Sequence, residues 1–422
     1  MISQNRRLTM KDNQAKYPQL RFKGFTDPWV QRELSDIAEV RTGKAFSSSD
    51  FTDDGEFRVV TNKNIQDKTT GKIFTGDRIN VSDQTVIDKY VLSGENILVT
   101  MDGANIGKVG MYTDSGALLA QRVGRLNSSV LNFVYQIVSD EKFISRMNQL
   151  AVGNAIKHIS LEQIGRYEIA VPESETEKTK IGQLLSNLDN LIAANQRKLD
   201  LLKEQKKGYL QKMFPKNGAK VPELRFAGFA DAWEQRKLKD TLSLIKDGTH
   251  GTHKDGNFSM LLSTKNLING KVVFNKSKDR KIGKKDYDSI FKGYSIHEKD
   301  VLLSVVGSIG RLALYYPQDI PIAFQRSVAI LRGNKSLEQE FLKYVLETHD
   351  AQRQLKMRTT MSAQPDLFLG DLSQVMIKVP IFKEQIKIIK IFDSISNLIA
   401  SNQRKLEKLQ ELKKGYLQKM FC

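Results

Sequence analysis

Histidine is the residue type here best suited to metal or acid–base chemistry, and the sequence contains five: His158, His250, His253, His297 and His349. Only His250 and His253, in the segment THGTH, lie close enough in sequence to act together, and no cysteine is near them. A structural zinc site needs four cysteine or histidine ligands and a catalytic one needs three protein ligands. The sequence therefore predicts no metal site.

A glycine-rich segment, GANIGKVG at residues 103–110, has some features of a phosphate-binding loop. It has one residue too few between Gly103 and Gly107, and no serine or threonine follows Lys108. We interpret it as a tight glycine turn after a buried strand. The chain also lacks a dinucleotide fingerprint, a nucleophile elbow and an Asn/Asp-Pro-Pro-aromatic motif of the methyltransferase type. Because all of these motifs are incomplete or missing, we expect a chain without catalytic chemistry and without a cofactor of its own.

The charge balance favours a polyanionic partner. The chain has 66 Lys and Arg against 48 Asp and Glu, which leaves a formal net charge of +18. The alternative is a basic protein whose lysines are merely solvated. No apolar run approaches the roughly 20 residues that span a bilayer. The lysines also do not line one face of an otherwise apolar amphipathic segment, so we expect no membrane partner. The only cysteine is Cys422, which suits a reducing cytoplasm, and residues 1–16 are expected to form a flexible leader.

Two kinds of internal repeat divide the sequence into halves. Residues 17–36 match residues 221–240 without a gap, and this pair contains the only two tryptophans, Trp29 and Trp233. Residues 190–214 match residues 397–421 at 20 of 25 positions. Between these repeats the halves diverge, although short landmarks keep their order, including AQRVGRL at 120–126 and FQRSVAIL at 324–331. Short β-type runs and a few helices predict an α+β domain followed by one long helix in each half.

Each long helix has a heptad seam, with apolar or semi-apolar residues at alternating steps of four and three. We expect an antiparallel coiled coil in which Asn195 and Asn402 meet near the centre, although a parallel pair would also align them. At about 1.5 Å per residue, some 33 residues give a rod of roughly 50 Å. Because one turn of DNA is about 34–36 Å long, domains at the two ends of such a rod would suit two DNA half-sites separated by unread base pairs. The lysines outside the seam are expected to be solvated. The central seam residues are Leu188, Ile192, Asn195, Leu199, Ile395, Ile399, Asn402 and Leu406.

Candidate DNA contacts are the basic and amide residues in turn-like segments, because Arg, Lys, Asn and Gln read bases and hold phosphates. Gln121–Arg122 and Gln325–Arg326 occur in both halves, so we assign them to structure or to phosphate contacts. Base readers should lie where the halves differ, as in TGKAFSSSDF against KDGTHGTHKDGNF. The candidates are Lys44, Lys63, Asn64, Lys108, Arg122, Lys157 and His158 in the first half, and His250, His253, Lys254, Lys265, Asn266, Arg311 and Arg326 in the second.

From about Tyr17 to Phe421 the sequence resembles the specificity (S) subunits of type I restriction–modification enzymes. The similar segments are ELRFAGFADAWEQRKL, the doubled NQRKL…KKGYLQKMF, and the helix entry containing Pro172, Glu177 and Ile181. The second entry is one residue shorter, with Ser396 in place of Asp189, which leaves only the helix cap in doubt. The resemblance implies two α/β target-recognition domains, at 17–173 and 221–380. It also implies spacer helices at 174–214 and 381–422, which form an antiparallel coiled coil, and a linker at 215–220.

The resemblance further implies a non-catalytic subunit that reads a split, asymmetric DNA site. Its partners would be double-stranded DNA, two methyltransferase (M) subunits and two restriction or motor (R) subunits. S-adenosylmethionine, ATP and magnesium would belong to those partners. The repeated helix residues Lys207, Tyr209, Lys414 and Tyr416 are candidates for partner docking, although the tyrosines would serve equally well as seam residues. Alternatives are a stand-alone DNA methyltransferase or nuclease, and a coiled-coil DNA-binding regulator.

Overall fold

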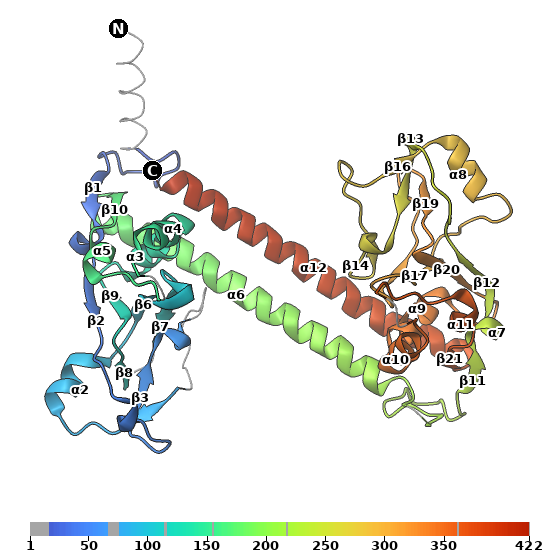
Figure 1. The fold of residues 1–422 in the computed structure, drawn as a ribbon, viewed down its shortest axis with the longest axis horizontal. Coiled ribbons are helices and arrows are strands. Elements are labelled where there is room, and N and C mark those ends of the chain that lie inside the picture. The colour runs from blue at the N-terminus through green and yellow to red at the C-terminus, as the bar shows by residue number, and fades with distance from the viewer. Residues whose placement is uncertain are drawn as a thin grey trace, which may run out of the picture. The chain divides into compact units, whose positions relative to one another are not determined.

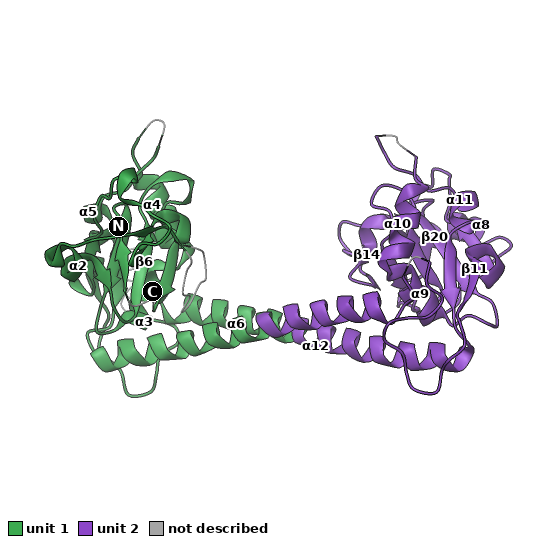
Figure 2. Cartoon of the chain, turned by 90° about the horizontal axis from the view of Figure 1, so that it is seen from below, with its two compact units in different colours: residues 1–196, 404–422 green, residues 197–403 purple. Residues whose placement is uncertain are grey.

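The computed structural model describes residues 17–65, 76–113, 116–153, 156–216, 218–360 and 363–421. The expected leader at 1–16 and the terminal Cys422 lie outside these residues. The chain divides into two compact units, which are coloured separately in Figure 2. The first unit contains residues 1–196 and 404–422, and the second contains residues 197–403. The units therefore do not coincide with the sequence halves. The first unit includes the end of the long helix of the second half, and the second unit includes the end of the long helix of the first half.

The first unit is built around two four-stranded sheets (Figure 1). One sheet has the order β2-β9-β6-β7 and is antiparallel throughout; the other has the order β4-β3-β8-β5, with β3 and β8 parallel. Strand β1 pairs separately with β10. The strands are β1 Val30–Glu33, β2 Glu39–Thr42, β3 Phe57–Val60, β4 Arg78–Ile79, β5 Val91–Leu92, β6 Asn96–Thr100, β7 Val109–Tyr112, β8 Ala117–Leu119, β9 Val123–Asn127 and β10 Glu168–Val171.

Short helices cover this first unit. The continuous apolar pattern at 131–150 is divided into two helices, because Asp140 caps the second by accepting from the Lys142 amide. Their buried faces pack with Trp29 and Leu34 against the β6 strand to form the main core. The helices are α2 Gln84–Tyr90, α3 Leu131–Val138, α4 Glu141–Leu150 and α5 Leu161–Gly165.

The second unit repeats this plan. Its antiparallel sheet β12-β20-β17-β18 corresponds to β2-β9-β6-β7, and β13 again has a parallel neighbour, β19. Trp233 takes the place of Trp29 in the core. The strands are β11 Glu234–Lys237, β12 Leu242–Asp247, β13 Asp255–Leu262, β14 Leu267–Ile268, β15 Lys271–Val272, β16 Lys281–Ile282, β17 Val301–Ser304, β18 Leu312–Leu314, β19 Ile322–Phe324, β20 Val328–Gly333 and β21 Met376–Val379. The short helices are α7 Leu238–Thr241, α8 Lys284–Ile290, α9 Gln339–Glu347, α10 His349–Met357 and α11 Leu369–Ser373.

Two long helices complete the units: α6, Glu175–Lys212, and α12, Phe382–Met420. In the first unit α6 begins and α12 ends, so the two segments run antiparallel (Figure 2); in the second unit the roles are reversed. The seam residues Leu188, Leu199, Ile395 and Leu406 are buried, while Ile192 and Ile399 are half-buried.

The seam asparagines are each buried, with 8% of Asn195 and 8% of Asn402 exposed. The Asn195 side-chain amide donates to the Leu191 carbonyl, and the Asn402 amide donates to the Leu398 carbonyl. Each asparagine thus satisfies its buried donor on its own helix. The expectation that the two residues meet each other stays a prediction.

The repeated segments at 17–29 and 221–233 attach each unit to the helices in the same way. Arg21 makes a two-pronged ion pair with the fully buried carboxylate of Glu177, and Arg225 does so with Glu384. At the other helix end, the Leu20 amide donates to the Lys419 carbonyl and the Leu224 amide to the Lys212 carbonyl. Each repeated segment therefore joins the start of one long helix to the end of the other. Within the described residues, no helix combines the length and apolarity that a membrane crossing requires.

Candidate nucleic-acid interface

In the first unit, turns from five separate segments are joined at one end of the strands. We call them the first turn cluster: Gly43–Lys44, Thr61–Asn64, Met101–Lys108, Gln121–Arg122 and Lys157–Ile159. The Gln121 amide donates to the Lys44 carbonyl, and the Met101 amide donates to the Arg122 carbonyl. The Gly103 amide donates to the Lys157 carbonyl, and the Asn62 side chain bonds to Asp102. This frame brings the first-half candidates together.

The second turn cluster has the same frame. It consists of Gly248–His250, Ser263–Asn266, Val305–Arg311, Gln325–Ser327 and Pro365–Leu367. The Arg326 amide donates to the Thr249 carbonyl, the Val305 amide to Ser327, and the Gly307 amide to Pro365. The Thr264 hydroxyl also donates to the Val306 and Ser327 carbonyls. The two clusters therefore share their backbone bonding while their side chains differ.

Two glycines make this frame possible. A Cβ at Gly43 would lie 2.0 Å from the Leu119 carbonyl oxygen, and one at Gly248 would lie 2.1 Å from the Phe324 carbonyl oxygen. Only glycine allows the backbones to approach so closely. The residue that follows is Lys44 in one unit and Thr249 in the other, so a shared frame presents different side chains. The shared glycine in TGK and DGT was the sequence signal for this frame.

The glycine segments at 103–110 and 307–310 are turns after buried strands, as the sequence predicts. Gly103, Gly107, Gly307 and Gly310 all have positive φ, between 75° and 90°. The first turn follows β6 and the second follows β17. The second turn is held by Ser304, whose hydroxyl accepts from the Arg311 amide and donates to the Ser308 carbonyl.

The prediction that Gln121–Arg122 corresponds to Gln325–Arg326 is wrong by one residue. The Ala120 amide donates to Val60 in the first unit, and the equivalent bond in the second runs from Gln325 to Leu262. Strand pairing agrees, because Thr100 opposes Val123 and Ser304 opposes Val328. Gln121 therefore corresponds to Arg326, and Arg122 to Ser327. Since Arg122 is not shared, the reason for excluding it from base reading no longer applies.

The candidates differ in how far they are available to a ligand. Asn266 is only 2% exposed, and its amide is engaged with Ser263, Val273 and Asp279, so its role here is structural. Asn64 likewise accepts from the Thr61 amide. Lys44, Lys108 and His158 are half-buried. The exposed candidates are Lys63, Arg122 and Lys157 in the first unit, and His250, Lys254, Lys265, Arg311 and Arg326 in the second.

The two histidines of THGTH hold their own loop. The His253 ring lies 2.6 Å from the Thr249 hydroxyl, and the His250 ring contacts the Asp247 carboxylate. Among the residues that the structure describes, no group of three or more His, Cys, Asp or Glu could hold a metal ion. Nearby, Lys265 lies 2.7 Å from Asp279 and lowers the pKa of that carboxyl group through their hydrogen bond.

The comparisons with known proteins agree with a duplicated recognition fold. Residues 26–204 and 231–411 each match the family described as "Type I restriction modification DNA specificity domain". The chain belongs to this family. It is 23% identical over 345 residues to the type I restriction enzyme MjaVIII specificity subunit of Methanocaldococcus jannaschii, covering 78% of this chain and 79% of the relative. It is 22% identical over 424 residues to the EcoBI specificity subunit of Escherichia coli, covering 94% and 86%.

The fold also matches a solved member of this kind. The S subunit of a type I restriction–modification system from M. genitalium superposes with a TM-score of 0.65 at 17% identity, covering 96% of this chain and 99% of that one. Each family match runs from a tryptophan segment into a long helix. The specificity domains of the sequence therefore differ from the compact units of the structure. Each compact unit also contains the end of the long helix that belongs to the other specificity domain.

Equivalent lysines dock these helix ends differently in the two specificity domains. Lys413 lies 2.6 Å from Asp189, which also accepts from Gln136. Lys206, its counterpart, lies 3.0 Å from Glu347 on α9. Burial acts to raise the pKa of Glu347, but the charges and hydrogen bonds of Lys343 and Lys206 lower it overall. One repeated lysine thus has a carboxylate partner in each unit, supplied by different elements.

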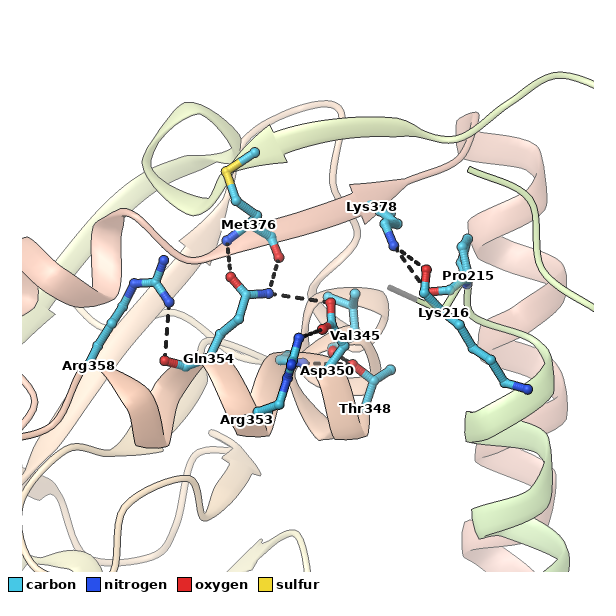
Figure 3. Close-up of polar contacts among 11 residues, drawn as sticks. Pro215, Lys216, Val345, Thr348, Asp350, Arg353, Gln354, Arg358, Met376 and Lys378 are labelled. Atoms are coloured by element: carbon cyan, nitrogen blue, oxygen red, sulfur yellow. Dashed lines mark hydrogen bonds and ion pairs between the residues drawn. The ribbon is translucent and has the colours of Figure 1, made fainter. Parts of the chain in front are cut away.

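The second specificity domain also secures the chain where α6 ends (Figure 3). The Lys378 ammonium donates to the Pro215 and Lys216 carbonyls, at 3.3 and 2.6 Å. Gln354 on α10 exchanges two hydrogen bonds with the Met376 backbone of β21. In the first unit, the strand register places Ala170 at the position that Lys378 has in the second unit, so this contact is not repeated by a lysine there. A hollow of about 560 Å³ lies beside the end of α6. It is lined by Leu210, Gln211, Phe214, Pro215, Lys216, Thr348, His349, Asp350 and Arg353.

Proposed function

We propose that this chain is the DNA-recognition subunit of a type I restriction–modification complex, with each unit reading one half of a split, asymmetric site. The observation that carries this proposal is the pair of turn clusters, which share a backbone frame and present different side chains. A family whose members specify DNA sites would use such a duplication to read two different half-sites. The net charge of +18 supplies the general attraction to phosphates.

The long helices would act as the spacer between the half-sites, and partner subunits would supply the chemistry. The expected partners are two methyltransferase and two motor-nuclease subunits, which would bring S-adenosylmethionine, ATP and magnesium. Tyr209 and Tyr416 pack against the cores of their units. The exposed neighbours Lys207 and Lys414 are therefore the better probes of partner docking.

Mapping methylated adenines by single-molecule sequencing tests this function. Cells with the chain and its methyltransferase partner should show one bipartite, asymmetric methylated motif, which disappears when the chain is deleted. Exchanging residues 41–170 for another specificity domain should change one half of the motif only. A symmetric, ungapped motif, or methyl transfer by the purified chain alone, would contradict the proposal.

Salt provides an independent test with purified protein. Phosphate neutralisation releases counterions, so the logarithm of the binding constant should fall linearly and steeply with the logarithm of salt concentration. A flat response would show that the positive charge is not used for DNA. Inserting one or two helical turns before Asn195 and in the paired part of α12 should lengthen the gap without altering either half-site.

A further inference from the structure

A short segment beside the Lys157–Ile159 part of the first turn cluster displays apolar side chains. Its described residues are Val152, Gly153, Ile156, Lys157 and His158, and the name 152–158 hairpin refers to these residues alone. Val152 and His158 exchange two backbone hydrogen bonds, of 3.0 and 2.8 Å. The Gly103 amide donates to Lys157, and the next residue, Ile159, donates to the Met101 carbonyl. The arm of the hairpin that contains Lys157 and His158 is therefore attached to the turn that follows β6.

Gly153 fixes the shape of this hairpin. Its φ is +123°, and a Cβ there would lie 2.2 Å from the Ile156 carbonyl oxygen. A residue with a side chain would be strained in this conformation and would also collide with the opposite backbone. The close approach of the Gly153 and Ile156 backbones therefore fixes the positions from which the Val152 and Ile156 side chains start.

Two β-branched aliphatic residues on the hairpin are exposed, Val152 by 54% and Ile156 by 67%. Two cations of the same turn cluster, Lys157 and Arg122, are exposed as well. The corresponding segment of the second unit, located by the bond from the Thr360 amide to the Asp366 carbonyl, has the sequence TMSAQPD instead of VGNAIKH. The aliphatic pair is therefore a feature of one recognition unit, placed where the two units differ.

The neighbouring cations favour DNA as the partner of these side chains. In the grooves of DNA, the apolar group that distinguishes one base from the others is the C5 methyl group of thymine. We propose that Val152 and Ile156 contact thymine methyl groups in the half-site read by the first unit, while Lys157 and Arg122 hold adjacent phosphates. This inference rests on the proposed function and adds a base preference to it.

Replacing thymine by deoxyuridine removes the methyl group alone and provides the test. The half-sites are first assigned by the exchange of residues 41–170. The complex of this chain with its methyltransferase partner is then titrated with fluorescent duplexes in which each thymine of the first half-site is replaced in turn. With the natural chain, at least one replacement should weaken binding roughly fourfold, the factor expected for one buried methyl group.

The same titrations are repeated with Val152→Ala/Ile156→Ala. This variant should bind the thymine duplex more weakly and should lose the sensitivity to deoxyuridine, because the contact is already gone. The matched control is Val273→Ala, which trims an exposed valine of the second unit. The control should keep the full deoxyuridine effect in the first half-site.

Three results would overturn the inference while leaving the proposed function intact. The first is a first half-site without thymine, and the second is a deoxyuridine effect of equal size in natural and variant complexes. The third is loss of methyltransferase binding by the variant with unchanged DNA discrimination, which would make the hairpin a protein-docking element. Failure of the natural complex to prefer its genomic motif over scrambled DNA would instead contradict the proposed function itself.

Discussion

The Lys413 ammonium lies 2.6 Å from the Asp189 carboxylate, although 224 positions separate the two residues in sequence. Both side chains are only 18% exposed. The pair joins the C-terminal part of α12 to the N-terminal half of α6 within the first unit, and Gln136 adds a third member from α3. This contact shows at the level of single atoms that the first recognition unit includes the last helical turns of the chain.

Substituting Lys413 by alanine should destabilise the first unit. The change leaves the half-buried Asp189 carboxylate with Gln136 as its remaining partner, at a cost of about 1–3 kcal/mol. Lys414→Ala is the matched control, because its side chain is exposed and should change stability by about 0.5 kcal/mol or less. Urea unfolding of both variants checks this prediction, and equal midpoints for the two would contradict it.

Removing residues 416–422 should destabilise the core around Trp29, which is far away in sequence but in contact with these residues. Phe421 contacts the Trp29 ring edge-on at 6.1 Å, and Met420 is buried in the same cluster. The two tryptophans report separately on the two units, so the truncation is made in Trp233→Phe and Trp29→Phe backgrounds. Trp29 fluorescence should shift to longer wavelength and unfold at lower urea, while Trp233 fluorescence stays unchanged. An unchanged Trp29 signal would show that the helix end does not complete this unit.

Alanine at Gly43 should damage one half-site selectively. The added Cβ would lie 2.0 Å from a backbone oxygen, so the Gly43–Lys44 turn must move away from Leu119. We expect weaker discrimination at the half-site of the first unit, measured with duplexes mutated in either half, and no change at the other. Gly248→Ala should give the reciprocal result. Gly208→Ala, on an open helix surface, is the control and should stabilise the helix by about 1 kcal/mol.

Asp279 should contribute an acid-sensitive part of the stability of the second unit. Lys265 and the surrounding donors lower its pKa in the folded state. A carboxyl group with a lowered folded pKa stabilises the fold above its unfolded pKa of about 3.9, and this contribution is lost as pH falls through the folded pKa. Asp279→Asn should therefore reduce stability at pH 7 and flatten its decline below about pH 4. Urea unfolding between pH 7 and pH 3 measures this, and parallel curves for variant and natural chain would argue against it.

Repeats and heptad spacing in the sequence were enough to predict the duplicated α+β units and the two long helices, because periodic apolar residues report directly on which face of an element is buried. The repeated tryptophan and helix segments also indicated that the halves share one structure. Local turn chemistry was predictable as well, since positive φ angles at Gly103 and Gly107 follow from glycine's freedom.

Only the tertiary structure decided how these parts combine. The structural equivalence of Arg122 and Ser327 depends on strand pairing within each unit, which a one-residue insertion hid in the sequence comparison. The burial of Asn266 and the exposure of Ile156 depend on neighbours far away in the chain. Likewise, the sequence determined that the helix ending at Met420 would have an apolar seam. Which core that seam completes was decided by long-range packing around Trp29, since a heptad pattern specifies a buried face and not its partner.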